Sequence, residues 1–334
     1  MVFALANSEF DIIKKFLATP NLNFLRDGVE LGIGDDAAII KPPPDQNLVF
    51  SLDVLASGVH FPADAKPDVI ARRALGVNLS DLAAMAADPL CFTLGLTIPE
   101  IKEDWIEQFT DGLSTLAREF NCPLVGGDLS SGPLQIAIQV HGLVPDGMAT
   151  LRSGAQIGDS ILVTGTLGDA AVALLGLGYE SHLGSDFKLH GLADPQPLFE
   201  RYFFPSPRVG FALGCRGLAN AAIDISDGFV SDLSHVLRES RLGAEIEEAA
   251  LPFSATAEAC LSESMLTQAC LNGGDDYELC LMVSQDSKDK VFEVAKNCDL
   301  SLCEVGIIEE IEGVRLKTRD GKMVAVNGDG YKHF

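Results

Sequence analysis

The sequence predicts two domains that each combine α-helices with β-strands. The chain has 334 residues, which is more than a single hydrophobic core usually organises. Strand-like and helix-like segments alternate along both halves of the chain. Between the halves, residues 145–153 contain a proline and a glycine, which suit a linker. We therefore place the domain boundary near residue 150, with one domain at 1–150 and the other at 151–334.

The first half carries three helix-like and four strand-like segments. Pro67 stands where a helix begins, and the alanine- and leucine-rich run that follows it predicts a long, mostly buried helix. The helices are expected at 9–17, at 69–87 and around Trp105, Phe109, Leu113 and Leu116. The strands are expected at 48–54, 89–98, 123–125 and 134–144.

The second half continues the alternation after residue 160. A polar stretch rich in glycine, aspartate and proline, ending at Pro207, is expected to be loop. The strands are expected at 160–164, 222–225, 277–283, 305–308 and 314–317. The helices are expected at 169–177, 208–220, 229–238 and 288–296.

The charge balance excludes some partners. Against 24 Lys plus Arg stand 48 Asp plus Glu, a formal net charge of −24, so the surface repels nucleic acid and anionic membrane. A phosphorylated small molecule is not excluded, because carboxylates can hold cations that reverse the local charge. The first 16 residues do not resemble a signal peptide, no apolar run is long enough to span a membrane, and the eight cysteines form no C-x-x-C pair. These features predict a cytoplasmic protein with reduced thiols.

The acidic residues form two populations. Most occupy segments typical of solvated helix faces. A smaller set lies among glycines, apolar residues and strand ends, where an unpaired carboxylate is costly. Its motifs are Gly-Ile-Gly-Asp-Asp36, Ser51-Leu-Asp53, Asn78-Leu-Ser-Asp81, Gly126-Gly-Asp128, Asp224-Ile-Ser-Asp-Gly228 and Gly273-Gly-Asp-Asp276. Each motif alone is more often a turn, but six together predict sites for a hard cation such as Mg²⁺.

Asp81 is an acidic residue of the second population, and it falls inside the most apolar predicted helix of the chain. A carboxylate there needs a cap, a buried partner or a cation. Pairing with Arg72 or Arg73 is the structural alternative, although both lie more than two turns away along the same helix. Asn78 supplies a neutral oxygen one turn earlier on the same face.

Phosphate chemistry is possible without a recognisable P-loop. The chain has no G-x-x-x-x-G-K-[ST] sequence, and its strand–glycine–helix turn at 163–169 is explained equally well as a tight turn. Arg152, at the proposed domain junction, could clamp a phosphate or be an ordinary surface arginine. His60 is the one histidine near a strand-end acid. With no convincing His–Asp pair, these features favour an ATP-dependent reaction assisted by several Mg²⁺ ions over Ser/His/Asp hydrolysis.

Taken together, the motifs resemble the thiamine-monophosphate kinase family, in order and over nearly the whole chain. Besides the acidic motifs, the resemblance rests on Gly58-Val-His-Phe61, Arg152-Ser-Gly-Ala155, Val163-Thr-Gly-Thr-Leu-Gly-Asp169 and the ending Gly330-Tyr-Lys-His-Phe334. It implies the two-domain fold of the aminoimidazole ribonucleotide synthetase superfamily, with an N-terminal α/β domain that binds ATP and Mg²⁺ and dimerises, and a C-terminal α+β domain. The implied reaction converts ATP and thiamine monophosphate into ADP and thiamine diphosphate by direct in-line transfer in a homodimer.

The resemblance also assigns individual residues. The positions that match metal-site residues of the family are Asp36, Ser51, Leu52, Asp53, Asp81, Asp128, Asp224 and Asp227. Gly127, Arg152 and Ser226 match ATP contacts, and His60 and Asp275 match contacts to thiamine monophosphate. No general base is implied, because the acceptor phosphate is already anionic near neutral pH.

Three positions depart from the family pattern. Leu52 replaces a threonine of some members, so only its backbone carbonyl could bind metal, and Asp275 replaces a glutamate. Gly328 stands where some members have an aromatic residue, which leaves Tyr331 as a substitute for stacking on the substrate.

The sequence leaves two alternative classes of function open. Related ATP-dependent enzymes are less favoured: a selenophosphate synthetase uses a cysteine or selenocysteine near its N-terminus, whereas the first cysteine here is Cys91. A hydrogenase-maturation relative would end in a functional cysteine, whereas this chain ends in Phe334. A non-catalytic acidic module that stores or senses divalent ions would bind metal without ATP turnover.

Overall fold

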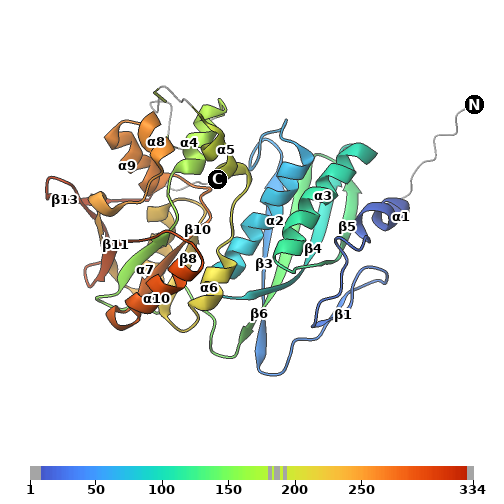
Figure 1. The fold of residues 1–334 in the computed structure, drawn as a ribbon, viewed down its shortest axis with the longest axis horizontal. Coiled ribbons are helices and arrows are strands. Elements are labelled where there is room, and N and C mark those ends of the chain that lie inside the picture. Colours follow the sequence, from blue (N-terminus) through green and yellow to red (C-terminus); the bar gives the residue numbers. More distant parts are fainter. Residues whose placement is uncertain (1–8, 180–182, 184–188, 191–193, 329–334) are drawn as a thin grey trace, which may run out of the picture. The chain divides into compact units, whose positions relative to one another are not determined.

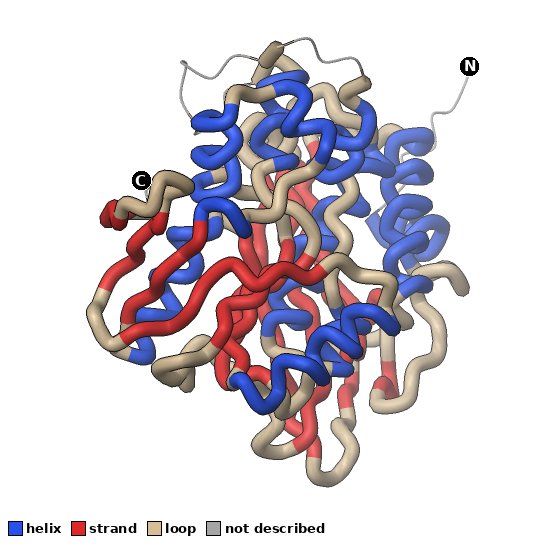
Figure 2. Tube along the Cα trace, turned by 60° about the vertical axis from the view of Figure 1, so that its left-hand side comes forward, coloured by secondary structure: helices blue, strands red, loops and turns tan. Residues whose placement is uncertain are grey.

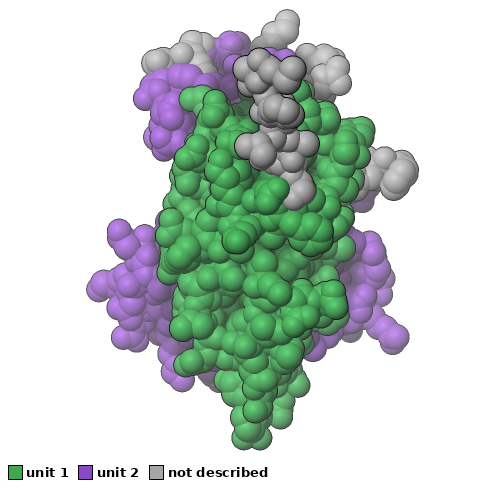
Figure 3. Space-filling model, turned by 90° about the vertical axis from the view of Figure 1, so that its right-hand side faces the viewer, with its two compact units in different colours: residues 1–82, 88–146 green, residues 83–87, 147–334 purple. Residues whose placement is uncertain are grey.

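The computed structural model describes residues 9–179, 183, 189–190 and 194–328. Helices and strands follow one another along the whole described chain (Figure 2). The chain divides into two compact units: unit 1 contains residues 1–82 and 88–146, and unit 2 contains residues 83–87 and 147–334 (Figure 3). The change from one unit to the other thus falls between Asp146 and Gly147, apart from the short segment 83–87.

Unit 1 is built on a four-stranded sheet with the order β3-β6-β4-β5. Strand β4 pairs with β5 in parallel, and the other two pairings are antiparallel. The elements are α1 (Glu9–Ile12), a π-helix (Ile13–Leu17), β1 (Val29–Leu31), β2 (Ile39–Ile40), β3 (Gln46–Ala56), α2 (Pro67–Ala84), β4 (Asp88–Ile98), α3 (Glu103–Glu119), β5 (Leu124–Ser131) and β6 (Gln135–Pro145).

Helices α2 and α3 cover one face of this sheet (Figure 1). They pack so closely that a Cβ on Gly112 of α3 would lie 2.3 Å from the carbonyl oxygen of Asp68 in α2. On the other face of the sheet, edge strand β3 presents four large apolar side chains that are 38 to 64% exposed: Leu48, Phe50, Leu52 and Val54. Period-2 alternation therefore gives β3 one face toward α2 and one apolar face toward solvent.

Unit 2 is built on a seven-stranded sheet with the order β13-β12-β9-β11-β7-β10-β8. Only the β9–β12 pair is parallel in this sheet. Its elements up to residue 250 are β7 (Ser160–Thr164), α4 (Asp169–Gly176), α5 (Gln196–Phe203), α6 (Val209–Gly214), β8 (Ala219–Ile225), α7 (Phe229–Ser240), β9 (Gly243–Glu247) and a 3₁₀-helix (Glu248–Ala250). Those that follow are α8 (Ala255–Cys260), α9 (Glu263–Asn272), β10 (Glu278–Val283), α10 (Gln285–Asn297), β11 (Leu302–Glu309), β12 (Gly313–Lys317) and β13 (Met323–Val326).

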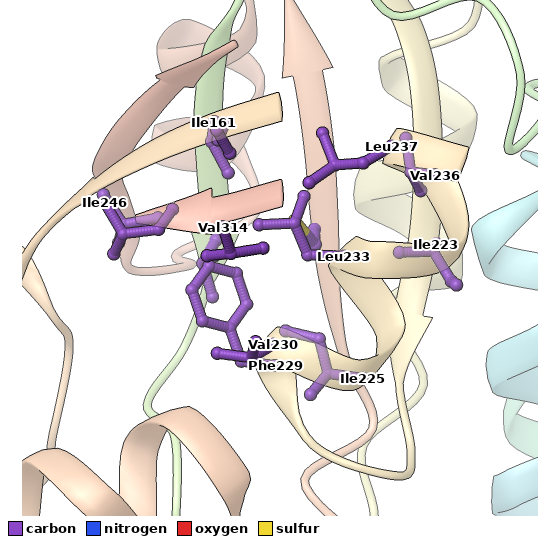
Figure 4. Packing of buried hydrophobic residues seen from close by; sticks show 14 of the residues in the cluster. Ile161, Ile223, Ile225, Phe229, Val230, Leu233, Val236, Leu237, Ile246 and Val314 are labelled. Atoms are coloured by element: carbon purple, nitrogen blue, oxygen red, sulfur yellow. The ribbon is translucent and has the colours of Figure 1, made fainter. Parts of the chain in front are cut away.

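The main core of unit 2 forms where α7 packs on the sheet (Figure 4). Phe229, Val230 and Leu233 from the first turns of α7 are fully buried. They meet isoleucines and valines of several strands, among them Ile225 and Ile246. Burial of each such side chain contributes roughly 1.5–3 kcal/mol, which fixes the start of α7 at the end of β8.

The sequence-based elements agree with the structure in most places. The long helix after Pro67, the strands of both sheet centres and the helix after Gly228 are confirmed. The helix expected at 208–220 is wrong in its second half: α6 ends at Gly214, and the alanine-rich residues after Leu218 form β8. Pairing with β10 overrides their helix propensity. Helix α5 lies in the stretch expected to be loop, and β1, β2, β9, α8, α9 and β13 were not anticipated.

In the described part of the chain, no helix combines the length and the apolar composition needed to cross a membrane.

Candidate active site

A cavity of about 740 Å³ in unit 1 contains one group of the predicted residues. Asp35 and Asp36 of the loop after β1 line it together with Gly126, Gly127 and Asp128 of β5. Apolar residues from the N-terminal helices and from β4 and β5 complete the wall: Phe10, Ile13, Leu17, Leu94, Leu124 and Val125. A volume between 300 and 1,000 Å³ with an apolar wall and a few polar groups is typical of small-molecule sites.

Position 127 in β5, on the wall of this cavity, has room only for glycine. Its φ is +150°, and a Cβ at this position would lie 1.9 Å from the carbonyl oxygen of Leu94 on the neighbouring strand. Any side chain would push β5 away from β4. The Gly-Gly-Asp sequence thus lets β5 approach β4 while Asp128 remains exposed at the cavity.

A second group of predicted residues lies between β3 and α2. The Ser51 hydroxyl donates to Oδ2 of Asp81 at 2.6 Å, and the backbone N–H of Asp53 donates to Oδ1 of Asn78 at 3.0 Å. The buried Asn78 in turn donates its amide to the carbonyl of Ala74 at 2.9 Å. Asp81 therefore has the Ser51 hydroxyl as a hydrogen-bond partner, and Asn78 orients the backbone at Asp53.

The strand register shows how far apart these two groups are. Asp53 is opposite Ile138, Ile138 is opposite Leu94, and Leu94 is opposite Gly127. Three steps of 4.7–4.9 Å across the sheet separate the backbones of Asp53 and Gly127 by about 14 Å. Within unit 1, the structure brings Asp36, Gly127 and Asp128 together at one edge of the sheet and Ser51, Asp53 and Asp81 at the other. Leu52 points its side chain, 56% exposed, to the face opposite Asp53.

The donor chemistry of both groups fits Mg²⁺. All the side chains offer oxygen, which is the ligand atom that this cation prefers. Among the described residues, no three His, Cys, Asp or Glu side chains come together in a group that could hold a metal ion. A magnesium–nucleotide complex does not need three such side chains, because Mg²⁺ usually takes one or two carboxylates and completes its shell with water and phosphate oxygens.

His60 is held in a tight turn at the end of β3. Its Nδ1 accepts the backbone N–H of Ala56 at 3.0 Å, and its carbonyl accepts from Nε of Arg73 at 3.0 Å. With Nδ1 as an acceptor, neutral His60 carries its proton on Nε2. The ring can therefore donate a hydrogen bond to an anionic oxygen from Nε2.

In unit 2, two loops contain the remaining predicted residues. The loop after β8 carries Ser226 and Asp227, and the loop before β10 carries Asp275. The backbone N–H of Asp275 donates to the carbonyl of Ser226 at 2.7 Å, and that of Tyr277 donates to the carbonyl of Ile225 at 2.8 Å. Asp224 is 4% exposed and pairs with Leu279 in the sheet. The structure thus brings Asp224, Ser226, Asp227 and Asp275 together at one end of β8.

Arg152 is exposed and lies near α7. The pKa of His235 is lowered by burial and by the positive charges of Arg238 and Arg152, while the charge of Asp227 opposes the shift. The charges of Arg152 and Asp227 therefore both influence the pKa of the His235 imidazole. Arg152, the arginine predicted to contact ATP, thus lies close to the loop after β8.

Buried ionic side chains behind these loops escaped the sequence reasoning. Glu278 is fully buried and accepts hydrogen bonds from Arg201, Arg208 and the hydroxyl of Thr164. Asp276, also fully buried, accepts from the backbone N–H groups of Gly168 and Ala170. Burial lowers the pKa of Arg201, but the charges of Glu278, Asp276 and Asp169 outweigh it and raise that pKa. The sequence feature that could have indicated these buried acids is the repetition of acidic residues in Gly273-Gly-Asp-Asp-Tyr-Glu278.

Gly328 lies against the start of α7. A Cβ there would lie 2.5 Å from the backbone nitrogen of Ser231, so a side chain at this position, including the aromatic one expected from the family pattern, does not fit this backbone. Tyr331 lies outside the described residues.

Comparison with known proteins places the chain in a family. The model for "AIR synthase related protein, N-terminal domain" matches residues 34–144, and that for "AIR synthase related protein, C-terminal domain" matches residues 156–318. The thiamine-monophosphate kinase of Escherichia coli (strain K12) is 40% identical over 331 residues, which cover 99% of each chain. The thiamine-monophosphate kinase of Salmonella typhimurium is 38% identical with the same coverage.

Solved structures agree with this assignment. The thiamine-monophosphate kinase from Stenotrophomonas maltophilia K279a superposes with a TM-score of 0.80 at 42% identity, covering 90% of this chain and 93% of that chain. AaThiL complexed with AMPPCP and TMP superposes with a TM-score of 0.74 at 30% identity, covering 90% and 92% of the two chains. A hydrogenase maturation protein HypE in complex with ATP, at 16% identity and a TM-score of 0.72, shares the fold alone.

The fold and the two matched models define the class of the protein, that of the AIR synthase related proteins with two mixed α/β domains. Within this class, the chain belongs to the thiamine-monophosphate kinase family.

Proposed function

We propose that this protein transfers the γ-phosphoryl group of ATP to thiamine monophosphate and releases ADP and thiamine diphosphate. The observation that carries the proposal is the similarity to thiamine-monophosphate kinases over 99% of the chain. AaThiL, whose complex contains AMPPCP and TMP, is similar over 90% of the chain. Of the residues that the family resemblance assigns to ATP and to the acceptor, Gly127 lines the unit 1 cavity, and Ser226 and Asp275 lie on the paired loops of unit 2.

The reaction requires no strong general base. The bond between the γ-phosphorus and the bridging oxygen of ATP breaks, and a new bond forms to a phosphate oxygen of thiamine monophosphate. That acceptor oxygen is anionic near neutral pH, because the second pKa of a phosphate monoester is about 6. Positioning and charge neutralisation then supply the catalysis, in a single in-line displacement.

The metal-binding residues that we propose fall into three groups. Asp36 and Asp128 line the cavity, Ser51, Leu52, Asp53 and Asp81 lie between β3 and α2, and Asp224 and Asp227 lie at the end of β8. Bound Mg²⁺ would neutralise negative charge on phosphate oxygens. The carboxylates fix where each cation is held, and Leu52 can contribute only its backbone carbonyl.

The proposed substrate contacts follow from the chemistry of the side chains. Backbone atoms at Gly127 can approach a phosphate closely, the Arg152 guanidinium can bind phosphate oxygens, and Ser226 can hydrogen-bond to ATP. His60 can donate from Nε2 to the acceptor phosphate. Asp275 suits the cationic thiazolium or the N–H donors of the aminopyrimidine, since a carboxylate favours both.

The direct test is a mixture of the protein, ATP, Mg²⁺ and thiamine monophosphate followed by phosphorus NMR. We expect signals of thiamine diphosphate and ADP to grow in equal amounts. Consumption of ATP with no thiamine diphosphate formed would favour another ATP-dependent reaction of the superfamily. Metal binding with no ATP turnover would favour the divalent-ion module.

We also propose that the protein is a cytoplasmic homodimer that binds its partner copy through unit 1. The supporting feature is the apolar face of β3, formed by Leu48, Phe50, Leu52 and Val54. Side chains as large and exposed as Phe50 at 64% are typical of an interface core.

We therefore expect Phe50→Asp to weaken the dimer. A buried charge in place of an aromatic contact costs at least ~2 kcal/mol, which is roughly a 30-fold increase in the dimer dissociation constant. Sedimentation equilibrium measures this constant, and each chain has a mass of 35.5 kDa. Ile157→Asp is the control, because Ile157 is 62% exposed in unit 2. A monomeric wild type, or equal weakening by both variants, would contradict the proposed interface.

A further inference from the structure

Two buried aspartates lie directly behind the two candidate binding loops of unit 2. Asp232, in the first turn of α7, is 3% exposed, and Asp276, in the loop before β10, is fully buried. Neither matches a residue that the family resemblance assigns to ATP, metal or substrate. An isolated buried carboxylate is expensive, so each needs a physical reason to be there.

Asp232 holds the loop after β8 through a single oxygen. Its Oδ2 accepts the backbone N–H groups of Ser226 at 3.0 Å, Asp227 at 3.0 Å and Gly228 at 3.2 Å. Three consecutive N–H groups converging on one atom leave the backbone of this loop little freedom. Burial and the charge of Asp227 raise the pKa of Asp232 to about 7, although the three N–H groups favour its charged form.

The loop after β8 is also held against Asp232 by close packing on its other side. Gly228 has a φ of +123°, and a Cβ there would lie 2.9 Å from the carbonyl oxygen of Asn272 at the end of α9. The chain after Asn272 is the second loop, which carries Asp275. The two loops are therefore packed backbone against backbone, in addition to the hydrogen bonds from Asp275 and Tyr277 to the first loop.

Asp276 anchors the second loop in a comparable way. Its Oδ2 accepts the N–H of Gly168 at 2.7 Å and its Oδ1 that of Ala170 at 3.4 Å, while its own carbonyl accepts from Arg201 at 3.2 Å. On either side of it, Asp275 and Tyr277 have φ values of +68° and +50°. Two non-glycine residues in the left-handed region cost of order 1–3 kcal/mol each and persist only where their surroundings hold them.

We propose that Asp232 and Asp276 are positioning residues: Asp232 sets the backbone that presents Ser226 and Asp227 to the nucleotide, and Asp276 sets the strained backbone that presents Asp275 to the phosphate acceptor. Neither carboxylate is proposed to touch a ligand. The assignment of ligands to the loops rests on the proposed function, whereas the anchoring of the loops rests on the hydrogen bonds alone.

The test compares graded substitutions at the two anchors. We expect Asp232→Ala to raise the KM for ATP about tenfold and the KM for thiamine monophosphate much less, by analogy with the 10- to 100-fold effects of residues that orient ligands. Asp276→Ala should raise the KM for thiamine monophosphate about tenfold and that for ATP much less. Asp232→Asn keeps an acceptor oxygen in place and should restore most of the ATP affinity, which a role limited to global stability does not predict.

A matched control separates positioning from stability. Asp159 is a buried aspartate of the same unit, 2% exposed, and accepts from the N–H of Gln156 and from the amide of Asn220. Asn220 lies at the opposite end of β8 from Ser226, so Asp159→Ala should lower the unfolding midpoint and leave both KM values unchanged. Unchanged KM values in Asp232→Ala and Asp276→Ala would overturn the proposal.

Equilibrium binding keeps this test independent of turnover. Isothermal titration of AMPPCP with Mg²⁺ into wild type and Asp232→Ala should show about tenfold weaker binding to the variant, whatever the phosphate acceptor. If Asp232→Ala does not fold, Asp232→Glu replaces it, because the longer side chain keeps the carboxylate and displaces the anchor. Wild-type affinity in the folded variant would overturn the positioning role. Failure of the wild type to form thiamine diphosphate would instead overturn the proposed function.

Discussion

Asp128→Asn is expected to lower the turnover number about 100-fold or more while leaving the fold intact. Asp128 is exposed at the cavity of unit 1, next to Gly127 in sequence, and Asp36 lines the same cavity. Exchanging its carboxylate for an amide removes one negative charge that would hold Mg²⁺ at the phosphates. Charge stabilisation by a bound cation is worth several kcal/mol in the transition state, and each 1.4 kcal/mol corresponds to a factor of ten.

The measurement is kcat at saturating ATP and thiamine monophosphate over a range of Mg²⁺ concentrations. We expect the half-saturating Mg²⁺ concentration to rise in the variant, and the thermal midpoint to stay within about 2 °C of the wild type, because an exposed site contributes little to stability. Asp111→Asn serves as the control, since Asp111 is an exposed aspartate on α3 of the same unit. Wild-type turnover in Asp128→Asn at every Mg²⁺ concentration would remove this carboxylate from the metal site.

Glu278→Ala is expected to cause the largest loss of stability. Glu278 is fully buried and forms ion pairs with Arg201 at 2.7 Å and with Arg208, whose side chains are only 20 and 21% exposed. Removal of the carboxylate takes these ion pairs away from two largely buried guanidinium groups, of which Arg201 retains only the longer pairing with Asp169 at 3.9 Å as an ion pair among the described residues. Breaking a buried ion pair in this way costs about 3–5 kcal/mol.

Thermal or urea unfolding measures this loss. For a unit of this size, 3–5 kcal/mol corresponds to a fall in the unfolding midpoint of roughly 6–20 °C. Glu247→Gln is the matched control, because Glu247 pairs with Lys317 at 2.6 Å while both side chains are more than 40% exposed. An exposed pair contributes at most about 1 kcal/mol. Equal losses in the two variants would show that Glu278 does not stabilise the core of unit 2.

Local chemistry made much of the fold predictable. Pro67, the apolar run after it and the absence of interruptions up to Ala84 define α2. Likewise, Gly228 followed by Phe229 and Leu233 defines the start of α7. The segments that escaped prediction, such as α5 and β9, depend on partners far away in the sequence. Strand β9, for example, is held between β11 and β12.

In the candidate site too, features set by neighbouring residues could be predicted from the sequence, and features set by distant residues could not. The motif around Asp53 predicts an oxygen-rich site, and the Ser51–Asp81 hydrogen bond agrees with that local chemistry. The separation of Asp53 and Gly127 across the sheet follows from the strand order β3-β6-β4-β5, which no local pattern contains. Asp232 and Asp276 were missed for a related reason, because the N–H groups that they accept are recognised only once the loops are folded.

We propose that the acidic motifs hold Mg²⁺ for phosphoryl transfer from ATP to thiamine monophosphate. The most direct measurement is the rate of thiamine diphosphate formation by phosphorus NMR during titration of Mg²⁺ into the metal-stripped protein with both substrates present. We predict no thiamine diphosphate without Mg²⁺, and saturable formation matched one-to-one by ADP as the metal is added. Formation of thiamine diphosphate at an unchanged rate in excess chelator would contradict this role of Mg²⁺, and so would consumption of ATP at any Mg²⁺ concentration with no thiamine diphosphate formed.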